Sequence, residues 1–385
     1  MPITLSKPQQ RVVEKARWVA RECLEPRAAG YDAAACHTWE SWKDLWEHGL
    51  LAISIPESHG GLGADMLTYI SVLESLAYGC TNSTMTMHMH SIVQQVITAI
   101  GTAEQKEVFF RDVVEDGKVF GSWGSEPESR GGTRAGKRTA IAPVENGYVV
   151  NGVKHFCTMA GAAHRYMVHC AMQGYEGVEA FQPVLVPCGA PGIKIDGEWN
   201  PLGMRATVSP TVFFNNCVVD PTCLLGKPGF VLKVGVIEGF GLGYAAIYLG
   251  AAQRALDFTV EYCKTHQFDP DPAPMSWSVV VQRSVAEMTM ELDAARQVLY
   301  QSAGQWESTD PAKRAVLAAR AKYLATCAAL SVTSECLKTV GGRSALKGLP
   351  LERLYRDVRT STLMPPNVDR CLDLVGKTEL DVPDL

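Results

Sequence analysis

Two histidines stand close together in a methionine-rich segment, Met85-Thr-Met-His-Met-His90. Because the ordinary pKa of histidine lies near neutral pH, His88 or His90 could act as a general acid or base. Side chains two residues apart point to opposite faces of a strand and diverge on a helix, so we do not expect the pair to bind one metal ion. The alternative is that both are hydrogen-bonded core histidines beside flexible methionines.

A second group that could do chemistry is basic. The segment 128–138 carries four cationic side chains, Arg130, Arg134, Lys137 and Arg138. Such a cluster could bind an anionic substrate, although solvated loop charges explain it equally well. Over the whole chain 36 basic residues stand against 41 acidic ones, and the net charge is −5. This balance argues against a protein that binds nucleic acid or an anionic membrane surface.

Twelve cysteines are spread along the chain without a Cys-x-x-Cys pair. Zinc knuckles and thioredoxin-type sites need such close spacing, so we predict no metal site. The first residues are polar, and no run reaches the roughly 18 apolar residues of a membrane span. We therefore expect a cytoplasmic protein whose cysteines are reduced and mostly buried as small apolar side chains.

The chain divides into three zones that differ in residue pattern, and these zones must position the groups named above. Residues 1–119 read as helical, with apolar residues at helical spacing in 40–49 and 69–78. Residues 120–227 predict a β domain, with strands at 183–187, 212–214 and 217–219 and a hairpin turn at Asn151-Gly152. Residues 228–385 predict long helices at 234–264, 280–306 and 311–340, and glycines in the first of these permit close helix packing.

Six short motifs occur in a fixed order between about residues 50 and 360. They are Ile55-Pro-Glu-Ser-His-Gly-Gly-Leu-Gly63, Gly101-Thr-Ala-Glu-Gln-Lys106, Gly152-Val-Lys-His-Phe-Cys-Thr158, Pro201-Leu-Gly-Met-Arg205, Gly250-Ala-Ala-Gln-Arg-Ala-Leu-Asp257, and Gly341-Gly342 followed by Leu351-Glu-Arg-Leu-Tyr-Arg-Asp357. Together they resemble the motifs of the acyl-CoA dehydrogenase superfamily. The resemblance implies an α+β fold with an N-terminal helical domain, a middle β-barrel domain and a C-terminal four-helix bundle. It also implies bound FAD and a homotetramer or homodimer.

By this resemblance, one end of the cofactor lies against the β domain. Trp123 and Ser125 belong to a loop that faces the flavin ring, and Phe156 covers the ring in place of the family's tryptophan. Thr158 keeps the hydroxyl expected near the reactive nitrogen, where hydrogen bonds tune the flavin. The alternative for Phe156 and Thr158 is an ordinary hairpin in which the phenylalanine is buried and the threonine is exposed.

The phosphate end of the cofactor departs from the family pattern. The family's arginine before Gln267-Phe268 is missing, because Thr265 stands there, and Lys338 replaces a glutamine. Lysine can still meet a phosphate as a point charge. The resemblance assigns Gln267, Phe268, Lys338, Asn367 and the backbone amides of Gly341 and Gly342 to the cofactor. FMN is therefore an alternative to FAD.

The position of the family's catalytic glutamate is occupied by Pro365, which cannot accept a proton. Some family members carry the base on the long helix after the β domain, where Glu238 lies a few residues upstream of that site. Glu238, His88 and His90 are thus the candidate bases, each with a structural role as the alternative. The resemblance assigns the substrate to four residues, Arg130, Met87, Tyr244 and Met364.

The tail offers a rival interpretation. Arg356-Asp-Val-Arg-Thr-Ser-Thr-Leu363 resembles the corresponding segment of dibenzothiophene-type flavin monooxygenases, which take reduced flavin from a reductase and need no carboxylate base. Their two histidines correspond to Ser361 and Met364. Because the resemblance covers most of the chain and these histidines are absent, we expect oxidation of an acyl-CoA or acyl-carrier thioester at its α,β carbons, with a non-standard base and an electron acceptor. The alternatives are oxygenation of another small molecule with reduced flavin, and a flavin- or acyl-binding scaffold without catalysis.

Overall fold

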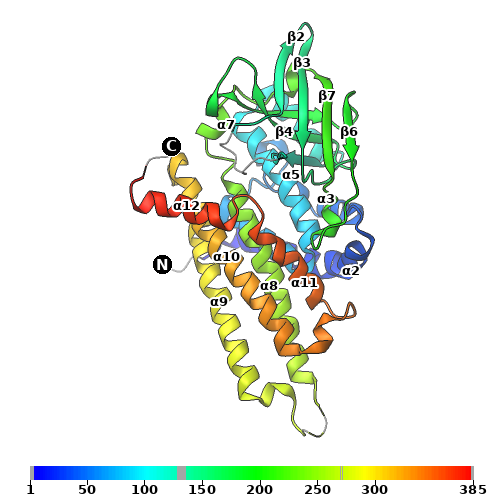
Figure 1. The fold of residues 1–385 in the computed structure, drawn as a ribbon, viewed down its shortest axis with the longest axis vertical. Coiled ribbons are helices and arrows are strands. Elements are labelled where there is room, and N and C mark those ends of the chain that lie inside the picture. Colours follow the sequence, from blue (N-terminus) through cyan, green and yellow to red (C-terminus); the bar gives the residue numbers. More distant parts are fainter. Residues whose placement is uncertain (1–3, 128–135, 269, 271, 383–385) are drawn as a thin grey trace.

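The computed structural model describes residues 4–127, 136–268, 270 and 272–382. The molecule is elongated, with a twisted sheet at one end and long helices at the other (Figure 1). The N-terminal helices pack along the side of both parts. The boundaries that we predicted after 119 and 227 fall in the connections before β1 and α7, and this division remains our proposal.

The N-terminal zone is helical, as its spacing predicted. Capping residues set several helix starts: Ser6 with Gln9 forms a capping box before the first helix, and Thr102 with Gln105 forms another before the sixth. The fourth and fifth helices are buried on almost every face. The helices are α1 (Lys7–Val19), α2 (Glu25–Ala34), α3 (Trp39–Glu47), α4 (Met66–Gly79), α5 (Thr81–Ile100) and α6 (Ala103–Val114).

The middle zone forms one seven-stranded sheet of order β1-β4-β2-β3-β7-β6, with β5 on the other side of β4. The described residues contain no ladder between β5 and β6 that would close the sheet into a barrel. The two strands predicted at 212–214 and 217–219 are one continuous strand, β7. The strands are β1 (Phe120–Trp123), β2 (Ala140–Val144), β3 (Gly147–Lys154), β4 (Arg165–Met172), β5 (Phe181–Pro187), β6 (Ile193–Asp196) and β7 (Thr211–Val219).

The predicted hairpin turn at Asn151-Gly152 was wrong. Strand β3 runs through both residues, and the pairing with β7 shifts between Val150 and Gly152, so the dipeptide marks a bulge. The turn of the β2–β3 hairpin lies before Gly147, whose φ of 148° suits glycine. Two Asn-Gly pairs five residues apart gave the same local signal, and only the pairing with β7 distinguishes them.

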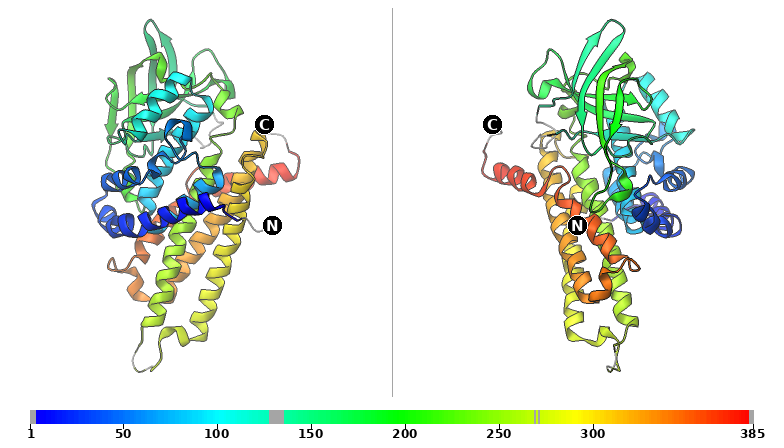
Figure 2. Two further views of the ribbon diagram at one scale, coloured as in Figure 1. Left: turned by 180° about the vertical axis from the view of Figure 1, so that it is seen from behind. Right: turned by 45° about the vertical axis from the view of Figure 1, so that its right-hand side comes forward.

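The C-terminal zone is built on three long helices, and Figure 2 shows them extending as one bundle away from the sheet. The helix predicted over 234–264 begins at Gly239, because Gly235 takes a φ of 64° against Pro311. Its glycines do permit close packing: a Cβ on Gly250 would lie 2.2 Å from the Glu74 carbonyl oxygen. The helices are α7 (Phe230–Lys233), α8 (Gly239–Thr265), α9 (Val279–Gly304), α10 (Pro311–Val340), α11 (Leu351–Arg359) and α12 (Val368–Glu379).

Helix α10 is the one described helix that is long and apolar enough to pass a test for a membrane span. Half of the tested stretch is buried in the molecule, and α10 packs against α8, α9, α11 and α12. Burial against neighbouring helices accounts for its composition.

Most of the cysteines are buried, as predicted. The eight buried ones are Cys80, Cys157, Cys170, Cys217, Cys223, Cys263, Cys336 and Cys371.

Candidate functional site

An exposed aromatic shelf lies just beyond the end of β3. Phe156 has a φ of 55°, and 69% of its side chain is accessible to solvent, so the ring stands out from the sheet. Trp199 meets its edge at 6.5 Å. The amide of His155 donates to the Ser125 carbonyl at 3.0 Å, which joins the loop 124–127 to the shelf. The ordinary hairpin with a buried phenylalanine is therefore wrong, and the exposed ring can stack on a planar ligand.

The Trp123 side chain does not face this space, and the contact of its loop with the flavin stays a prediction. Its ring is fully buried, stacked on Tyr166 at 3.9 Å, and its Nε1 donates to the Thr158 carbonyl at 2.9 Å. Since β1 is covered on both faces, an indole here packs in the core. Trp123 thus positions the backbone of Thr158 from beneath.

A buried ion pair that no sequence motif indicated supports the shelf. Lys154 Nζ lies 2.6 Å from Glu126 Oε1, with both side chains buried. The Glu126 carboxylate also accepts from the amides of Arg138 and Thr139, at 2.8 and 3.0 Å. Burial alone would raise the pKa of Glu126, but the Lys154 charge and these hydrogen bonds lower it to about 2. Glu126 is therefore ionised and fully engaged.

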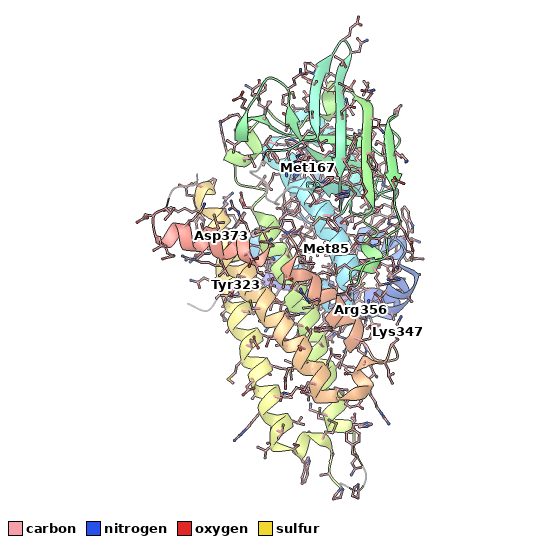
Figure 3. All side chains as sticks on the ribbon, in the orientation of Figure 1. Met85, Met167, Tyr323, Lys347, Arg356 and Asp373 are labelled. Carbon is pink, nitrogen blue, oxygen red and sulfur yellow. The ribbon has the colours of Figure 1, made fainter. Side chains whose placement is uncertain are left out.

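A second network fixes the loop 201–209 above α11. Asp357 accepts from the Met204 amide at 2.6 Å and from Asn82 Nδ2 at 3.0 Å, and the Ala206 amide donates to Asn82 Oδ1. Burial raises the pKa of Asp357 to about 6, although the Arg353 charge opposes this. Next to it Arg356, labelled in Figure 3, binds both carboxylate oxygens of Asp32 at 3.0 and 2.6 Å.

His88 is buried between three helices. Its Nε2 lies 3.2 Å from the Phe240 carbonyl, which can only accept, so Nε2 carries the proton and Nδ1 accepts from the Tyr69 hydroxyl at 2.7 Å. A Cβ on Gly243 would collide with the ring, so α8 has a glycine at this contact. Burial lowers the pKa of His88 to about 3. The structure therefore favours the core histidine, neutral and fully hydrogen-bonded.

His90 takes the same structural role elsewhere. Its Nδ1 accepts from the Phe120 amide at 2.9 Å, and Nε2 lies 3.1 Å from the Leu51 carbonyl. Burial lowers the pKa of His90 to about 3. On α5 the two histidines diverge, as the spacing predicted, and His90 ties the helix to the sheet. Among the described residues, no three His, Cys, Asp or Glu side chains are grouped to hold a metal ion.

Helix α5 carries two further buried methionines on a different face from Met87, whose contact with the substrate stays a prediction. His88 faces α8 and Asn82 faces the loop 201–209, so Met85 and Met89 lie on the sector between them. Met85, labelled in Figure 3, lies where α5 passes between the sheet and the long helices. Met87 is buried on the other side of His88, toward the core. The helical period of α5 separates the face that carries Met85 and Met89 from the face that carries Met87.

Tyr244 lies one turn of α8 before Tyr248, and its contact with the substrate stays a prediction. Its ring meets the edge of His88 at 5.2 Å, and its hydroxyl makes no hydrogen bond to a described residue. The Tyr248 hydroxyl lies 3.0 Å from Thr360 Oγ1, which joins α8 to the segment that leads to Pro365. Tyr244 thus presents a polar tip on an apolar wall.

Glu238 occupies the N-cap position of α8, where its side chain makes no capping hydrogen bond, and it is half-buried. Its role as the base stays a prediction.

The segment after α11 carries no proton acceptor at the expected place. Pro365 is exposed, Met364 is half-buried against the core, and Asn367 caps α12 by accepting from the Arg370 amide at 2.9 Å. The cap uses only Asn367 Oδ1, and the role of this residue with a cofactor stays a prediction. Ser361 is buried, and its carbonyl accepts from Lys322 Nζ at 2.8 Å.

The residues expected at the cofactor phosphates are not brought to the shelf within one chain. Gln267 and Phe268 lie in the connection between α8 and α9, at the far end of the bundle in Figure 1. Lys338 is exposed near the C-terminal end of α10 and pairs with Glu335 at 3.0 Å. The Gly341 amide donates to the Leu337 carbonyl, so it is not available, contrary to expectation. Arg130 lies outside the described residues.

These observations fit one part of a flavin better than the other. The exposed ring of Phe156, the half-buried Thr158 hydroxyl and the anchored loop 124–127 form a shelf for the ring system. The residues that we expected at the cofactor phosphates, Gln267, Phe268 and Lys338, do not lie beside this shelf in one chain. The ring end of the cofactor is therefore supported by this structure.

Comparisons with known proteins cover nearly the whole chain. The family models for the N-terminal, middle and C-terminal domains of acyl-CoA dehydrogenase match residues 6–116, 121–217 and 242–363. Dibenzothiophene monooxygenase from Mycolicibacterium goodii is 30% identical over 92% of this chain and 90% of its own. Human mitochondrial short-chain specific acyl-CoA dehydrogenase is 29% identical over 94% of this chain and 87% of its own.

A solved structure agrees with these matches. Butyryl-CoA dehydrogenase from Megasphaera elsdenii is 27% identical and superposes with a TM-score of 0.91, covering 99% of this chain and 100% of that chain. Three matched domains in the family order, with relatives similar over their full length, show that this chain belongs to the acyl-CoA dehydrogenase family of flavoprotein oxidoreductases.

Proposed function

We propose that this protein is a two-component monooxygenase that takes reduced flavin from a reductase and oxygenates a small, uncharged, apolar molecule. One atom of dioxygen goes to the substrate and the other leaves as water. The two electrons come from the reduced flavin, which ends oxidised. The ring of FMN or FAD is held on the Phe156 shelf.

The observation that carries this proposal is the state of the carboxylates. Pro365 stands at the position of the family's base, and Glu238 lies at the N-cap of α8, upstream of the alternative base site. Glu126 and Asp357 are engaged by backbone amides. Abstraction of a proton beside a thioester carbonyl needs a base within hydrogen-bonding reach. Among the described residues, the buried carboxylates Glu126 and Asp357 are engaged, while Asp196 and Glu198, which line the hollow beside Phe156, are exposed to solvent.

We expect the substrate to lie against the surface of α5 and α8 around His88, which is neutral and mostly apolar. His88 carries no charge at neutral pH, and Met85, Met89 and Tyr244 complete the surface. A charged substrate would lose its hydration here without gaining an ionic partner. When bound, reduced flavin supplies the electrons and activates dioxygen. The residues of the chain stack the ring, exclude water and leave the Tyr244 hydroxyl to orient the substrate.

A second candidate is the oxidation of an acyl-CoA or acyl-carrier thioester. The full-length similarity to the human short-chain enzyme favours it. It would need a base that the described residues do not show, and an electron acceptor such as an electron-transferring flavoprotein.

The oligomer is part of the proposal. Gln267, Phe268 and Lys338 lie on the bundle, away from their own shelf. We expect them to meet the phosphate end of the flavin on a neighbouring subunit, which requires a homodimer or homotetramer. We expect this assembly in the cytoplasm.

Anaerobic and aerobic assays separate the two candidates. Protein loaded with oxidised FAD or FMN is mixed anaerobically with butyryl-CoA, and the flavin absorbance is followed. Protein loaded with reduced flavin is then mixed with oxygenated buffer and dibenzothiophene, the substrate in the name of a relative. Oxygen incorporated into an organic product, with no anaerobic bleaching, supports the proposal. Bleaching by the thioester without oxygenation would refute it.

A further inference from the structure

Three hydroxyl groups form a chain behind the Phe156 shelf. Thr158 Oγ1 lies 3.1 Å from Ser209 Oγ, Ser209 Oγ lies 2.9 Å from Thr207 Oγ1, and Thr207 Oγ1 lies 2.9 Å from the Met204 carbonyl oxygen. Thr207 and Ser209 are buried, whereas Thr158 is half-buried. Both ends of the loop that carries Thr207 are anchored, since Asp357 holds the Met204 amide and the Pro210 carbonyl accepts from the Cys157 amide.

The number of hydroxyl hydrogens fixes which group donates in each contact of this hydroxyl chain. The hydroxyl chain has three oxygen–oxygen contacts, and each needs one hydrogen to be attractive. A carbonyl only accepts, so the contact with Met204 must use the hydrogen of Thr207. The contact between Ser209 and Thr207 must then use the hydrogen of Ser209. The contact between Thr158 and Ser209 is left with the hydrogen of Thr158.

Thr158 consequently has no hydrogen to offer to a ligand. Its oxygen has already donated to Ser209 and presents only lone pairs toward the shelf, so it can accept a hydrogen bond but cannot give one. A ligand that places an N–H against Thr158 gains a hydrogen bond. A ligand that places a bare nitrogen or a carbonyl oxygen there meets two sets of lone pairs and is repelled.

We propose that this polarised hydroxyl chain makes the shelf select reduced flavin over oxidised flavin. The inference rests on the proposed function and names the redox state of the flavin that the site takes up. An oxidised isoalloxazine ring carries one N–H, at its pyrimidine end. The reduced ring carries a further N–H on the central ring, where the oxidised form has a bare acceptor nitrogen. A reduced ring bound with this N–H against Thr158 would gain a hydrogen bond that the oxidised ring cannot form.

The test is an anaerobic titration of flavin-free, full-length protein with oxidised FMN and with photoreduced FMN, by calorimetry. The wild type should bind the reduced form more tightly. In Ser209→Ala the hydrogen of Thr158 has lost its acceptor and can turn toward the ring. The ratio of the two dissociation constants should then move toward the oxidised form by about fivefold, which is the worth of one hydrogen bond.

Thr207→Val provides a second variant, because it frees the hydrogen of Ser209 to point at Thr158 and should shift the ratio in the same direction. Thr158→Ser keeps the chain and should keep the ratio. Thr333→Val, which removes a buried hydroxyl bonded to the Ala329 carbonyl in α10, should leave the ratio unchanged. Equal wild-type affinities, or a ratio that Ser209→Ala and Thr207→Val leave unmoved, would overturn this inference alone. Binding of neither flavin form would overturn the proposed function and the inference together.

Discussion

The buried pair of Lys154 and Glu126 joins the loop 124–127 to the strand that leads to Phe156, so removing one partner should disturb both stability and flavin binding. In Lys154→Met the Glu126 carboxylate stays buried with its two backbone donors but loses its counter-charge. In Glu126→Gln the lysine charge stays buried with the His169 carbonyl as its remaining partner. Each change leaves one uncompensated charge.

The size of the effect follows from burial. Removal of one member of a buried ion pair costs about 3–5 kcal/mol, because the remaining charge has lost its compensation. With an unfolding entropy of about 2 cal/mol/K per residue, 385 residues unfolding as one unit lose about 5 °C of Tm for 4 kcal/mol. A double variant, Lys154→Met with Glu126→Gln, leaves no charge and should recover part of this loss.

The assay is thermal unfolding by calorimetry at pH 7, with flavin affinity measured alongside. Lys118→Met is the matched control, because Lys118 pairs with Asp112 and Asp116 at the surface, where such pairs contribute about 0–1 kcal/mol. It should shift Tm by about 1 °C or less. If Lys154→Met shifts Tm no more than Lys118→Met does, the pair does not support the shelf as we argue.

The pH dependence gives an independent check with a definite sign. The pKa of Glu126 is depressed to about 2, so the stability that it contributes is present above its unfolded value near 4.5 and is lost as pH falls through 2. The difference in Tm between wild type and Glu126→Gln should therefore be the same at pH 5 and pH 7. A difference that shrinks between these values would contradict the depressed pKa.

Three further predictions concern the candidate bases and the core. Burial raises the pKa of Asp357 to about 6, so its contribution to the free energy of unfolding is present below about pH 4 and is lost as pH rises through 6. Between pH 4 and 7, urea unfolding should show the wild type losing up to about 3 kcal/mol of stability relative to Asp357→Asn. A difference between the two proteins that does not change with pH would contradict this. Tyr69→Phe removes the donor to His88 Nδ1 and should cost about 1–3 kcal/mol in urea unfolding, whereas a loss below about 0.5 kcal/mol would mean that the bond is not needed. Glu238→Gln should keep turnover within about twofold of the wild type, and a hundredfold loss would instead identify Glu238 as the base. Pro365→Glu should permit anaerobic bleaching of bound flavin by butyryl-CoA.

Much of the fold could be predicted because it depends on local pattern. Helical spacing and capping residues placed α3, α4, α9 and α10 within a few residues, and the switch to β-branched runs located the sheet. The errors came where the local signal was ambiguous. Asn146-Gly147 and Asn151-Gly152 are both hairpin sequences, and pairing with β7 decides that the second is a bulge.

The candidate site was predicted only in part. The motif order located Phe156 and Thr158, and the shelf is exposed as a ring-binding surface requires. The roles of His88 and His90 were ambiguous, because a catalytic base and a core histidine in an apolar helix have the same sequence pattern. Their partners, the Phe240 and Leu51 carbonyls, lie far away in the sequence and could not be foreseen.

The sequence by itself determined which chemistry is missing, since proline at position 365 has no proton acceptor in any fold. It also determined the order of helical and β zones, because hydrophobic period is a property of neighbouring residues. Only the tertiary structure decided the charge of each buried group and the direction of each hydrogen bond. Those depend on desolvation and on donors such as the Met204 and Arg138 amides, which folding brings to Asp357 and Glu126 from other elements.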